Sequence, residues 1–292
     1  MPAEATQTPE SDEAEEILTD LIGVAYHKAK VWRTWSIVLK SAIFAYGLVA
    51  IFIPNLTVAY SLVMLAVVAL TVWIEIKSGE YKGIAESLKR KHELLEGFNK
   101  KPSIGELTHL KMDLPDKLSD KLATLSKLGI AFASKKPKGA RRVLENLCEC
   151  GFFSHHEAKF CANGLMAIFT LTLIASIVLL YICAACVSVA PVAATIAKCI
   201  SSVLAFLVSI GVLKSLLAYN SFSRKAKTTE DRAAAMLSAP GHPEEGDVHA
   251  LLTEYQIARG SAPLIPTWVW KRLSPKLNAQ WAIRAKAFNK NP

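Results

Sequence analysis

The sequence predicts an all-α membrane protein with four transmembrane helices in two hairpins and helical extensions in the cytosol. Three observations lead to this fold class. Of the 292 residues, 52% are hydrophobic and only 20% are charged, which is a low charged share for a soluble globular protein. The apolar residues gather in two blocks, 35–76 and 161–218. Each block is long enough for two spans of roughly 20 residues.

A pair of helix breakers divides each block into two predicted spans. Pro54-Asn55 separates a span over 35–53 from one over 56–76. The second block divides at Ser188-Val-Ala-Pro191 into spans over 161–187 and 192–218. Burial in a large soluble core is the alternative. It fits poorly, because 161–187 contains no Asp, Glu, Lys or Arg and is longer than a soluble core helix usually needs to be.

The distribution of Lys and Arg predicts the orientation, because cytoplasmic flanks collect these residues. Residues 77–160 contain 17 Lys and Arg against 11 Asp and Glu, and residues 219–292 contain 11 against 6. The two hairpin tips, 54–57 and 188–195, carry no formal charge. We therefore expect a multi-pass protein with both termini and the central segment in the cytoplasm.

Apolar positions at helical spacing among charged residues predict cytosolic helices outside the hairpins. We expect an N-terminal helix that runs into the first span, and a second-span helix that continues to about Phe98. Shorter helices are expected at 114–132, 139–150, 228–238, 248–258 and 268–273. The chain then divides into an N-terminal cytosolic helix (1–34), hairpin 1 (35–76), a cytosolic helical region (77–160), hairpin 2 (161–218) and a C-terminal cytosolic helical region (219–292).

Small and hydroxyl-bearing residues inside the spans of hairpin 2 are candidates for lining a pore or for close helix packing. They are Thr172, Ser176, Ser202, Ala205 and Ser209. Charged residues at mid-membrane would indicate a carrier, but Lys40, Glu75, Lys198 and Lys214 lie toward span ends. A channel gated by an apolar constriction needs no such charges.

The sequence contains no recognisable enzyme motif. It has no Gly-rich phosphate loop, HExxH, GxSxG or paired CxxC zinc spacing, so we predict neither catalysis nor a cofactor. Soft metal ligands cluster at a spacing that matches no standard zinc site, and we predict no metal there: Cys148, Cys150, His155, His156 and Cys161. Cys183, Cys186 and Cys199 are either small packing residues or an outer-face disulfide.

The net charge of +9 is explained by contact with an anionic leaflet, and we expect no nucleic-acid partner. One strongly basic loop precedes hairpin 2. Its side chains are candidates for binding the phosphate of a ligand or a lipid, or they are simply solvated: Lys135, Lys136, Lys138, Arg141 and Arg142.

The C-terminal segment PLIPTWVWKRL (263–273) combines two prolines with two tryptophans. Pro263 and Pro266 favour an extended bridge. Trp268 and Trp270 then lie either at the inner membrane interface beside Lys271 and Arg272 or in a groove of the cytosolic helices. We favour the groove, because prolines that fix the chain direction suit docking.

Two stretches, AYHKAKVW (25–32) and PLIPTWVWKRL (263–273), resemble the aromatic and basic lead-in and the closing element of one family. This is the family of bacterial SMODS-associating four-transmembrane effectors, predicted pore formers of nucleotide-activated antiviral systems. The resemblance runs from about residue 15 to 285. It implies an inner-membrane effector that oligomerises and permeabilises the membrane when a partner nucleotidyltransferase makes a nucleotide second messenger.

Two other functions remain open from the residues alone. The chain is alternatively a non-conducting membrane scaffold or accessory subunit of a transport complex, or a small channel unrelated to defence. For the effector, the spans of hairpin 2 are the expected pore or oligomer contacts, and the cytosolic helices are the expected sensor.

Overall fold

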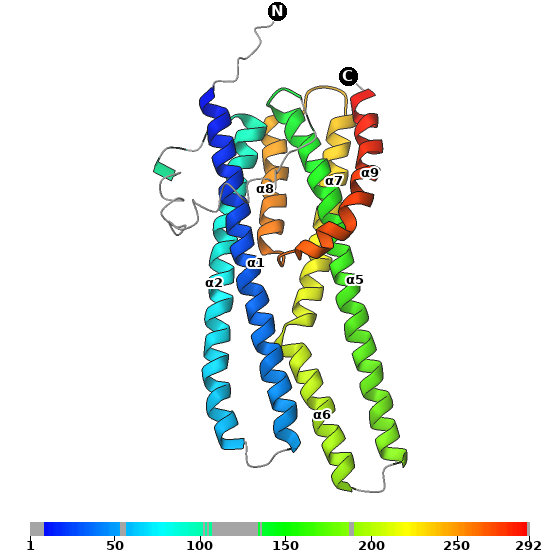
Figure 1. The fold of residues 1–292 in the computed structure, drawn as a ribbon. Coiled ribbons are helices and arrows are strands. Elements are labelled where there is room, and N and C mark those ends of the chain that lie inside the picture. The colour runs from blue at the N-terminus through cyan, green and yellow to red at the C-terminus, as the bar shows by residue number, and fades with distance from the viewer. Residues whose placement is uncertain are drawn as a thin grey trace, which may run out of the picture. The chain divides into compact units, whose positions relative to one another are not determined.

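Every regular element among the described residues of the computed structural model is an α-helix (Figure 1), which confirms the predicted all-α class. The structure describes residues 9–52, 57–101, 103, 105–106, 134, 136–186 and 190–290. Within these, the side chains of residues 9–17, 57–62, 184, 186, 190 and 287–290 are not described. The helices are α1 (Pro9–Phe52), α2 (Thr57–Phe98), α5 (Ala140–Cys186), α6 (Ala190–Ser209), α7 (Val212–Ser238), α8 (Glu245–Ser261) and α9 (Thr267–Lys290).

Several helices are longer than the sequence predicts. The continuity of α1 into the first span and of α2 to Phe98 is confirmed. The short helices expected at 139–150 and 228–238, however, are the first part of α5 and the last part of α7. No proline separates the cytosolic from the apolar stretch in either helix, so nothing ends the helix where the polarity changes. The helix expected at 114–132 lies outside the described residues.

The chain forms two compact units, which we call the polar unit and the apolar unit. The polar unit comprises Met1–Ala29, Gly79–Glu157 and Phe222–Pro292. The apolar unit comprises Lys30–Ser78 and Ala158–Ser221. Four helices are divided between the two units, with one segment in each: α1, α2, α5 and α7.

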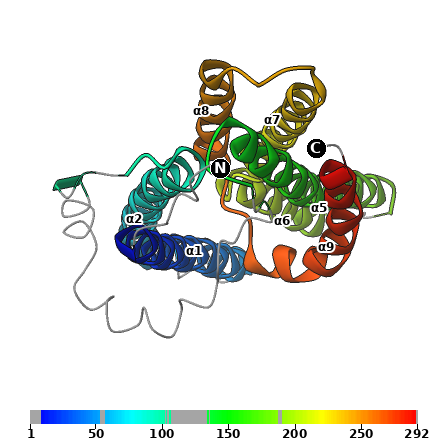
Figure 2. The same cartoon turned by 90° about the horizontal axis from the view of Figure 1, so that it is seen from above.

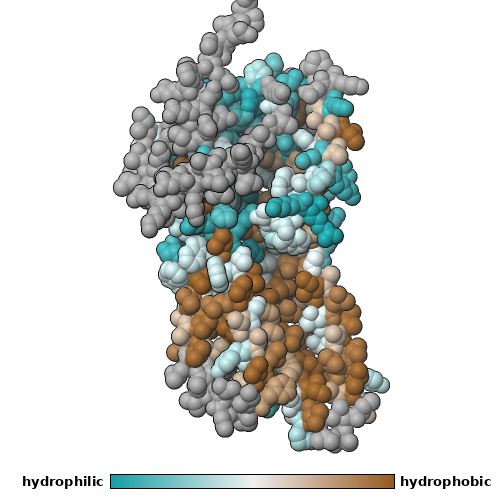
Figure 3. All heavy atoms as spheres, in the orientation of Figure 1, coloured by the Kyte–Doolittle hydropathy of each residue, from teal (hydrophilic) through white to brown (hydrophobic). Residues whose placement is uncertain are grey.

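The apolar unit leaves its hydrophobic side chains on the surface. Among the described residues, three stretches are long and apolar enough to cross a membrane: Leu18–Phe52, Ala140–Cys183 and Pro191–Ser238. Only 6% of the most apolar part of Ala140–Cys183 is buried, and Leu171 and Tyr181 are 68% and 73% exposed. On the face drawn in Figure 3, hydrophobic residues cover most of this unit. A soluble core does not leave such a surface open to water, so these helices indicate a membrane protein.

The predicted second span belongs to α2 and is not one of these three stretches. Its first residue, Leu56, lies outside the described part of the chain. The described side chains of α2 that follow include several exposed apolar ones, such as Leu65 and Trp73. The fourth span and the hairpin arrangement therefore stay predictions.

The first turns of α5 form the centre of the polar unit (Figure 2). Val143 packs on Gly97 of α2, and Ser154 bonds Tyr255 of α8 at 2.8 Å. Phe152 contacts Trp281 of α9, with 5.6 Å between ring centroids. A separate apolar cluster joins α1 to α2: Leu18, Leu21, Ile22, Val24, Ala25, Ala85, Leu88 and Leu95.

Candidate functional site

An apolar cavity of ≈ 620 Å³ lies between α5 and α6 in the apolar unit, with Phe52 of α1 at its wall. Two of the predicted pore or packing residues, Thr172 and Ser176, line it. Their hydroxyls donate to the carbonyls of Ile168 and Thr172, at 2.9 and 2.8 Å. Because each hydroxyl is bonded within its own helix, the cavity wall that these residues form is weakly polar.

The three predicted candidates on α6 do not line this cavity. Ser202 is half-buried, and its hydroxyl donates to Lys198 O at 2.9 Å. Ala205 and Ser209 lie on the exposed surface of the unit. Helix α6 meets the cavity instead with a neighbouring face that includes Thr195, Cys199 and Val203. The structure thus brings together the candidates of α5 but not those of α6.

A polar cluster lies where α6 ends and α7 begins. Helix α6 ends at Ser209 and α7 starts at Val212, and Gly211 between them has φ +71°, a conformation that favours glycine. The amide of Gly211 bonds back to Val208 O at 3.0 Å. The carbonyl of Ser209 accepts from Lys40 Nζ of α1 at 3.0 Å.

The same lysine forms an ion pair with α2. Lys40 Nζ lies 2.7 Å from Glu75 Oε1, and Ser36 Oγ donates to that oxygen at 3.0 Å. We call Ser36, Lys40, Glu75 and the Ser209 carbonyl the latch. One turn further along α1, Phe44 stacks on Phe206 of α6, with 4.4 Å between the ring centroids. The latch therefore connects α1 and α2 to the break between α6 and α7.

Sequence reasoning treated Lys40 and Glu75 as separate interfacial charges and missed the latch. Two signals were available. Ser36, Lys40 and Phe44 recur at four-residue spacing, which places them on one face of α1. Ile210-Gly211 also interrupts an otherwise apolar span with a residue that readily ends a helix.

The polar unit contains a buried charge cluster built around Arg259 of α8. Arg259 Nε donates to Glu86 Oε2 at 2.8 Å, and its terminal nitrogens bond Glu93. Tyr26 of α1 donates to Glu86, and Gln256 donates to Glu93 at 2.9 Å. We call these five residues the Arg259 cluster.

Electrostatics keeps the two glutamates of the cluster ionised. Burial alone raises the pKa of Glu93 and of Glu86, but the positive charge of Arg259 outweighs burial and leaves both pKa values below the ordinary value. The negative charges in turn raise the pKa of Arg259, although its burial acts in the opposite direction. All three groups are charged at neutral pH.

Lys82 fixes the chain just beyond this cluster. Its Nζ donates to the carbonyls of Gly260 and Ala262, both at 2.5 Å. These carbonyls belong to the last turn of α8 and to the bridge that leads to Pro263. Together, Lys82 and the Arg259 cluster hold the end of α8 against α2.

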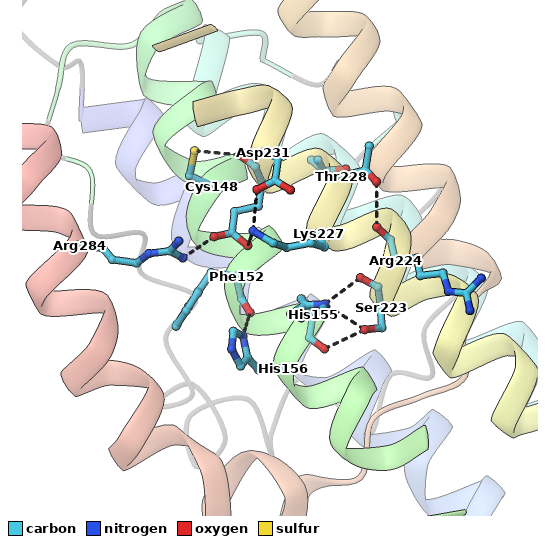
Figure 4. A network of polar contacts seen from close by, with 12 residues as sticks. Cys148, Phe152, His155, His156, Ser223, Arg224, Lys227, Thr228, Asp231 and Arg284 are labelled. Atoms are coloured by element: carbon cyan, nitrogen blue, oxygen red, sulfur yellow. Dashed lines mark hydrogen bonds and ion pairs between the residues drawn. The ribbon is translucent and has the colours of Figure 1, made fainter. Parts of the chain in front are cut away.

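A second polar network joins α5, α7 and α9 (Figure 4). Arg284 of α9 pairs with Glu230 of α7, and its guanidinium lies 5.1 Å from the Phe152 ring centroid. Lys227 pairs with Asp231 at 2.6 Å. This network fastens the second half of α9 to α5 and α7.

The soft-ligand residues singled out from the sequence have separate partners. Cys148 Sγ donates to Glu230 O at 3.8 Å. His155 Nδ1 lies 3.0 Å from Ser223 O, and His156 Nδ1 lies 2.9 Å from Phe152 O (Figure 4). Within the described part of the chain, no three His, Cys, Asp or Glu side chains gather as a metal site. Cys183 and Cys199 are free thiols, and the side chain of Cys186 is not described.

The basic loop does not form a converging phosphate site among its described residues. Arg142 pairs with the buried Glu96 and donates to Lys136 O at 2.9 Å. Arg141 lies 3.7 Å from Glu145, and Lys138 Nζ lies 3.5 Å from Asn99. Lys135 is outside the described residues. Much of this charge is therefore used to hold the start of α5 against the end of α2.

The C-terminal element differs from the groove-packed placement that we favoured. Trp268 is 59% exposed and Trp270 is 40% exposed, whereas Val269 between them is fully buried. Packing of both indoles into a groove is therefore wrong for Trp268, while Trp270 rests on Phe153 at 5.7 Å between ring centroids. Pro263 and Pro266 are half-buried. The helix that follows extends to Lys290, well past the expected end at residue 273.

Comparisons with protein-family models, with curated proteins and with solved structures found no match to this chain. The resemblance to four-transmembrane effectors therefore rests on the two short sequence stretches alone. The latch, the cavity and the two polar networks are the features of the structure that bear on function.

Proposed function

We propose that the chain is a membrane effector that oligomerises and opens a pore in the bacterial inner membrane. Opening follows a nucleotide second messenger from a partner nucleotidyltransferase and serves an antiviral response that kills the infected cell. The observation that carries the gated-pore part of this proposal is the latch at the α6–α7 break. The nucleotide and antiviral parts come from the family resemblance alone.

A broken span with a charged partner favours gating over a purely structural role. Backbone groups freed inside a membrane need a partner, because lipid supplies none. Lys40 supplies one to the Ser209 carbonyl, at the cost of placing a charged group within a predicted span. A scaffold gains nothing from this arrangement. A gate needs an element with two arrangements, and α6 and α7 can bend about Gly211.

More than one copy is needed for the pore. The cavity between α5 and α6 has a nearly apolar lining and offers no continuous polar path among the described residues. Exposed Ser209 and half-buried Ser202 lie on a different face of α6, where another copy can pack against small residues. An apolar constriction between copies then closes by excluding water.

Membrane potential in cells that express the protein tests this function. We expect depolarisation, reported by a potential-sensitive dye, only when the partner nucleotidyltransferase is co-expressed. Lys40→Met should depolarise the cells without it, because the latch is lost. Lys198→Met, which removes an exposed lysine of α6 outside the latch, is the matched control and should behave like the wild type.

Two outcomes count against the proposal. A potential that stays intact in every condition, with the protein present in the membrane, favours the non-conducting scaffold or accessory subunit. Depolarisation by the wild type that does not depend on the nucleotidyltransferase favours a channel unrelated to defence.

A further inference from the structure

Helix α9 is bent, and its two parts are held differently. Pro275 lies inside the helix, and its ring removes one backbone hydrogen bond and bends the helix. Figures 1 and 2 both show the first turns running across the direction of α5 and α7, while the later turns run alongside them. The later turns are fastened by Leu277 and Trp281, both buried, and by the ion pair of Arg284 with Glu230.

The start and the first turn of the crosswise segment are tied to residues that lie close in the chain to predicted span ends. The bridge before it is held by Lys82, about 9 Å along α2 beyond residue 76 at 1.5 Å per residue. Trp270 contacts Phe153 of α5, about 12 Å before residue 161 by the same helical rise. Because α5 continues from Phe153 into a predicted span without a break, this contact lies close in the chain to the predicted membrane interface.

The exposed face of this segment is aromatic and basic. Lys271 and Arg272 follow Trp268 by three and four residues, so the three share one helix face, and all three are exposed. The whole of α9 contains no Asp or Glu. Lys271 and Arg272 therefore give this exposed face a positive charge, which suits an anionic surface.

We propose that residues 267–274 form an interfacial anchor that binds the headgroup region of the anionic inner leaflet. Tryptophan settles at this depth because its ring is apolar while its N–H stays hydrated. Lysine and arginine beside it bind anionic lipid phosphates. Charge complementarity selects lipid as the occupant, and the buried Val269 and Leu264 hold the segment against the polar unit. This inference needs the membrane topology but not the pore.

Tryptophan quenching by lipid tests the placement in the full-length protein. The wild type and W268F/W270F are reconstituted in phosphatidylcholine and phosphatidylglycerol vesicles, with and without brominated acyl chains. The emission that the double substitution removes should fall by about half or more in brominated lipid, because interfacial indoles lie near the upper acyl carbons. W281F is the matched control, because Trp281 is only 8% exposed, and the emission it removes should be insensitive to bromine.

Amide hydrogen exchange tests the need for anionic lipid. In nanodiscs, exchange at residues 267–273 should be about fivefold slower with phosphatidylglycerol than with phosphatidylcholine alone, given the attraction of each cation to the anionic surface. K271Q/R272Q should lose this difference. K100Q/K101Q removes the same amount of charge just beyond the end of α2 at Phe98, and this variant should keep the difference in exchange between the two lipid compositions.

Contrary results are distinguishable. The proposal is overturned if brominated lipid does not quench the emission of Trp268 and Trp270 while aqueous acrylamide does. It is also overturned if neither quencher reduces this emission, because a second copy of the chain would then cover this face. Equal exchange in the two lipid compositions also overturns it. None of these outcomes bears on the pore, which is tested by membrane potential.

Discussion

At the residue scale, Arg259 determines how α8 is held, because it neutralises two buried carboxylates of α2. Glu86 and Glu93 are 5% and 7% exposed, and Arg259 is 7% exposed. We predict that Arg259→Met lowers the free energy of unfolding by about 3–5 kcal/mol, since it leaves both carboxylates buried without their cation. Denaturant unfolding of the detergent-solubilised chain measures this change.

A surface ion pair provides the control for this experiment. Arg232 pairs with Glu254 at 2.5 Å, but both side chains are about half exposed. Arg232→Met should change the free energy of unfolding by less than about 1 kcal/mol, because water screens an exposed pair. Equal effects of the two substitutions would show that the Arg259 cluster does not anchor α8.

The same cluster predicts how stability depends on pH. The folded-state pKa values of Glu86 and Glu93 are lowered by Arg259 against the opposing effect of burial. The pKa of glutamate in the unfolded chain is about 4.3. The stabilisation is therefore complete above that pH and is lost as the pH falls through the lower folded-state pKa values. Thermal unfolding between pH 7 and 3 should show this loss, and Glu93→Gln should make it shallower. An unchanged profile in that variant would contradict the assignment.

The sequence predicts individual residues well only where the signal is local. Apolar positions at helical spacing predicted that the second-span helix continues to about Phe98, and Leu88 and Leu95 in this stretch are fully buried. The partner of Glu86 lies 173 residues away in the sequence, and no local pattern encodes such a pair. The sequence favoured a groove for Trp268, which is exposed. The prolines before it indicate the direction of the chain but not which side chains face outward.

At the element scale, the approach of α5 to α7 depends on a glycine. A Cβ at Gly151 would lie 2.8 Å from Ala226 O and 3.1 Å from the Glu230 amide nitrogen, and backbone atoms of α7 cannot move aside easily. Gly151→Ala should therefore destabilise the protein by about 1–3 kcal/mol through overpacking. Thermal unfolding measures the loss.

Gly83 of α2 provides the opposite case, because nothing lies within 4 Å of a Cβ built there. Gly83→Ala should stabilise the protein by up to about 1 kcal/mol, since alanine favours the helix more than glycine does. If Gly151→Ala also stabilises the protein, α5 and α7 do not pack as closely as the structure has them.

Helix existence was predictable, and helix length was not. Apolar periodicity located parts of α1, α2, α5, α7 and α8, and it predicted that α1 and α2 continue through the change in polarity, but it ended the elements of α5 and α7 there. A helix continues through such a change when no proline or capping glycine interrupts it, as α5 does through Gly151 and Gly164. Pro275 shows the converse. It bends α9 without ending it, because Leu277 and Trp281 beyond it are buried.

At the scale of the whole molecule, the number of spans decides on which side each region lies. In the part of the chain that the structure describes, three stretches are long and apolar enough to cross the membrane: Leu18–Phe52, Ala140–Cys183 and Pro191–Ser238. Three crossings would place the termini on opposite sides. The basic excess of both 77–160 and 219–292 places those regions on one side. Two crossings separate these regions with or without a crossing by α2, so their shared side does not decide the count. Lys28, Lys30 and Arg33 before the first span favour an N-terminus on that same side, and the fourth crossing, by the first half of α2, is predicted on this ground.

Reporter fusions test this count. Alkaline phosphatase, active only outside the cytoplasm, should be active when fused after residue 55 or 189 and inactive after residue 138 or 292. Green fluorescent protein, fluorescent only when it folds in the cytoplasm, should give the reverse pattern. The same phosphatase result after residues 55 and 138 would mean that α2 does not cross. The latch between α1, α2 and the α6–α7 break would then lack its membrane setting, because Glu75 would belong to a helix outside the bilayer.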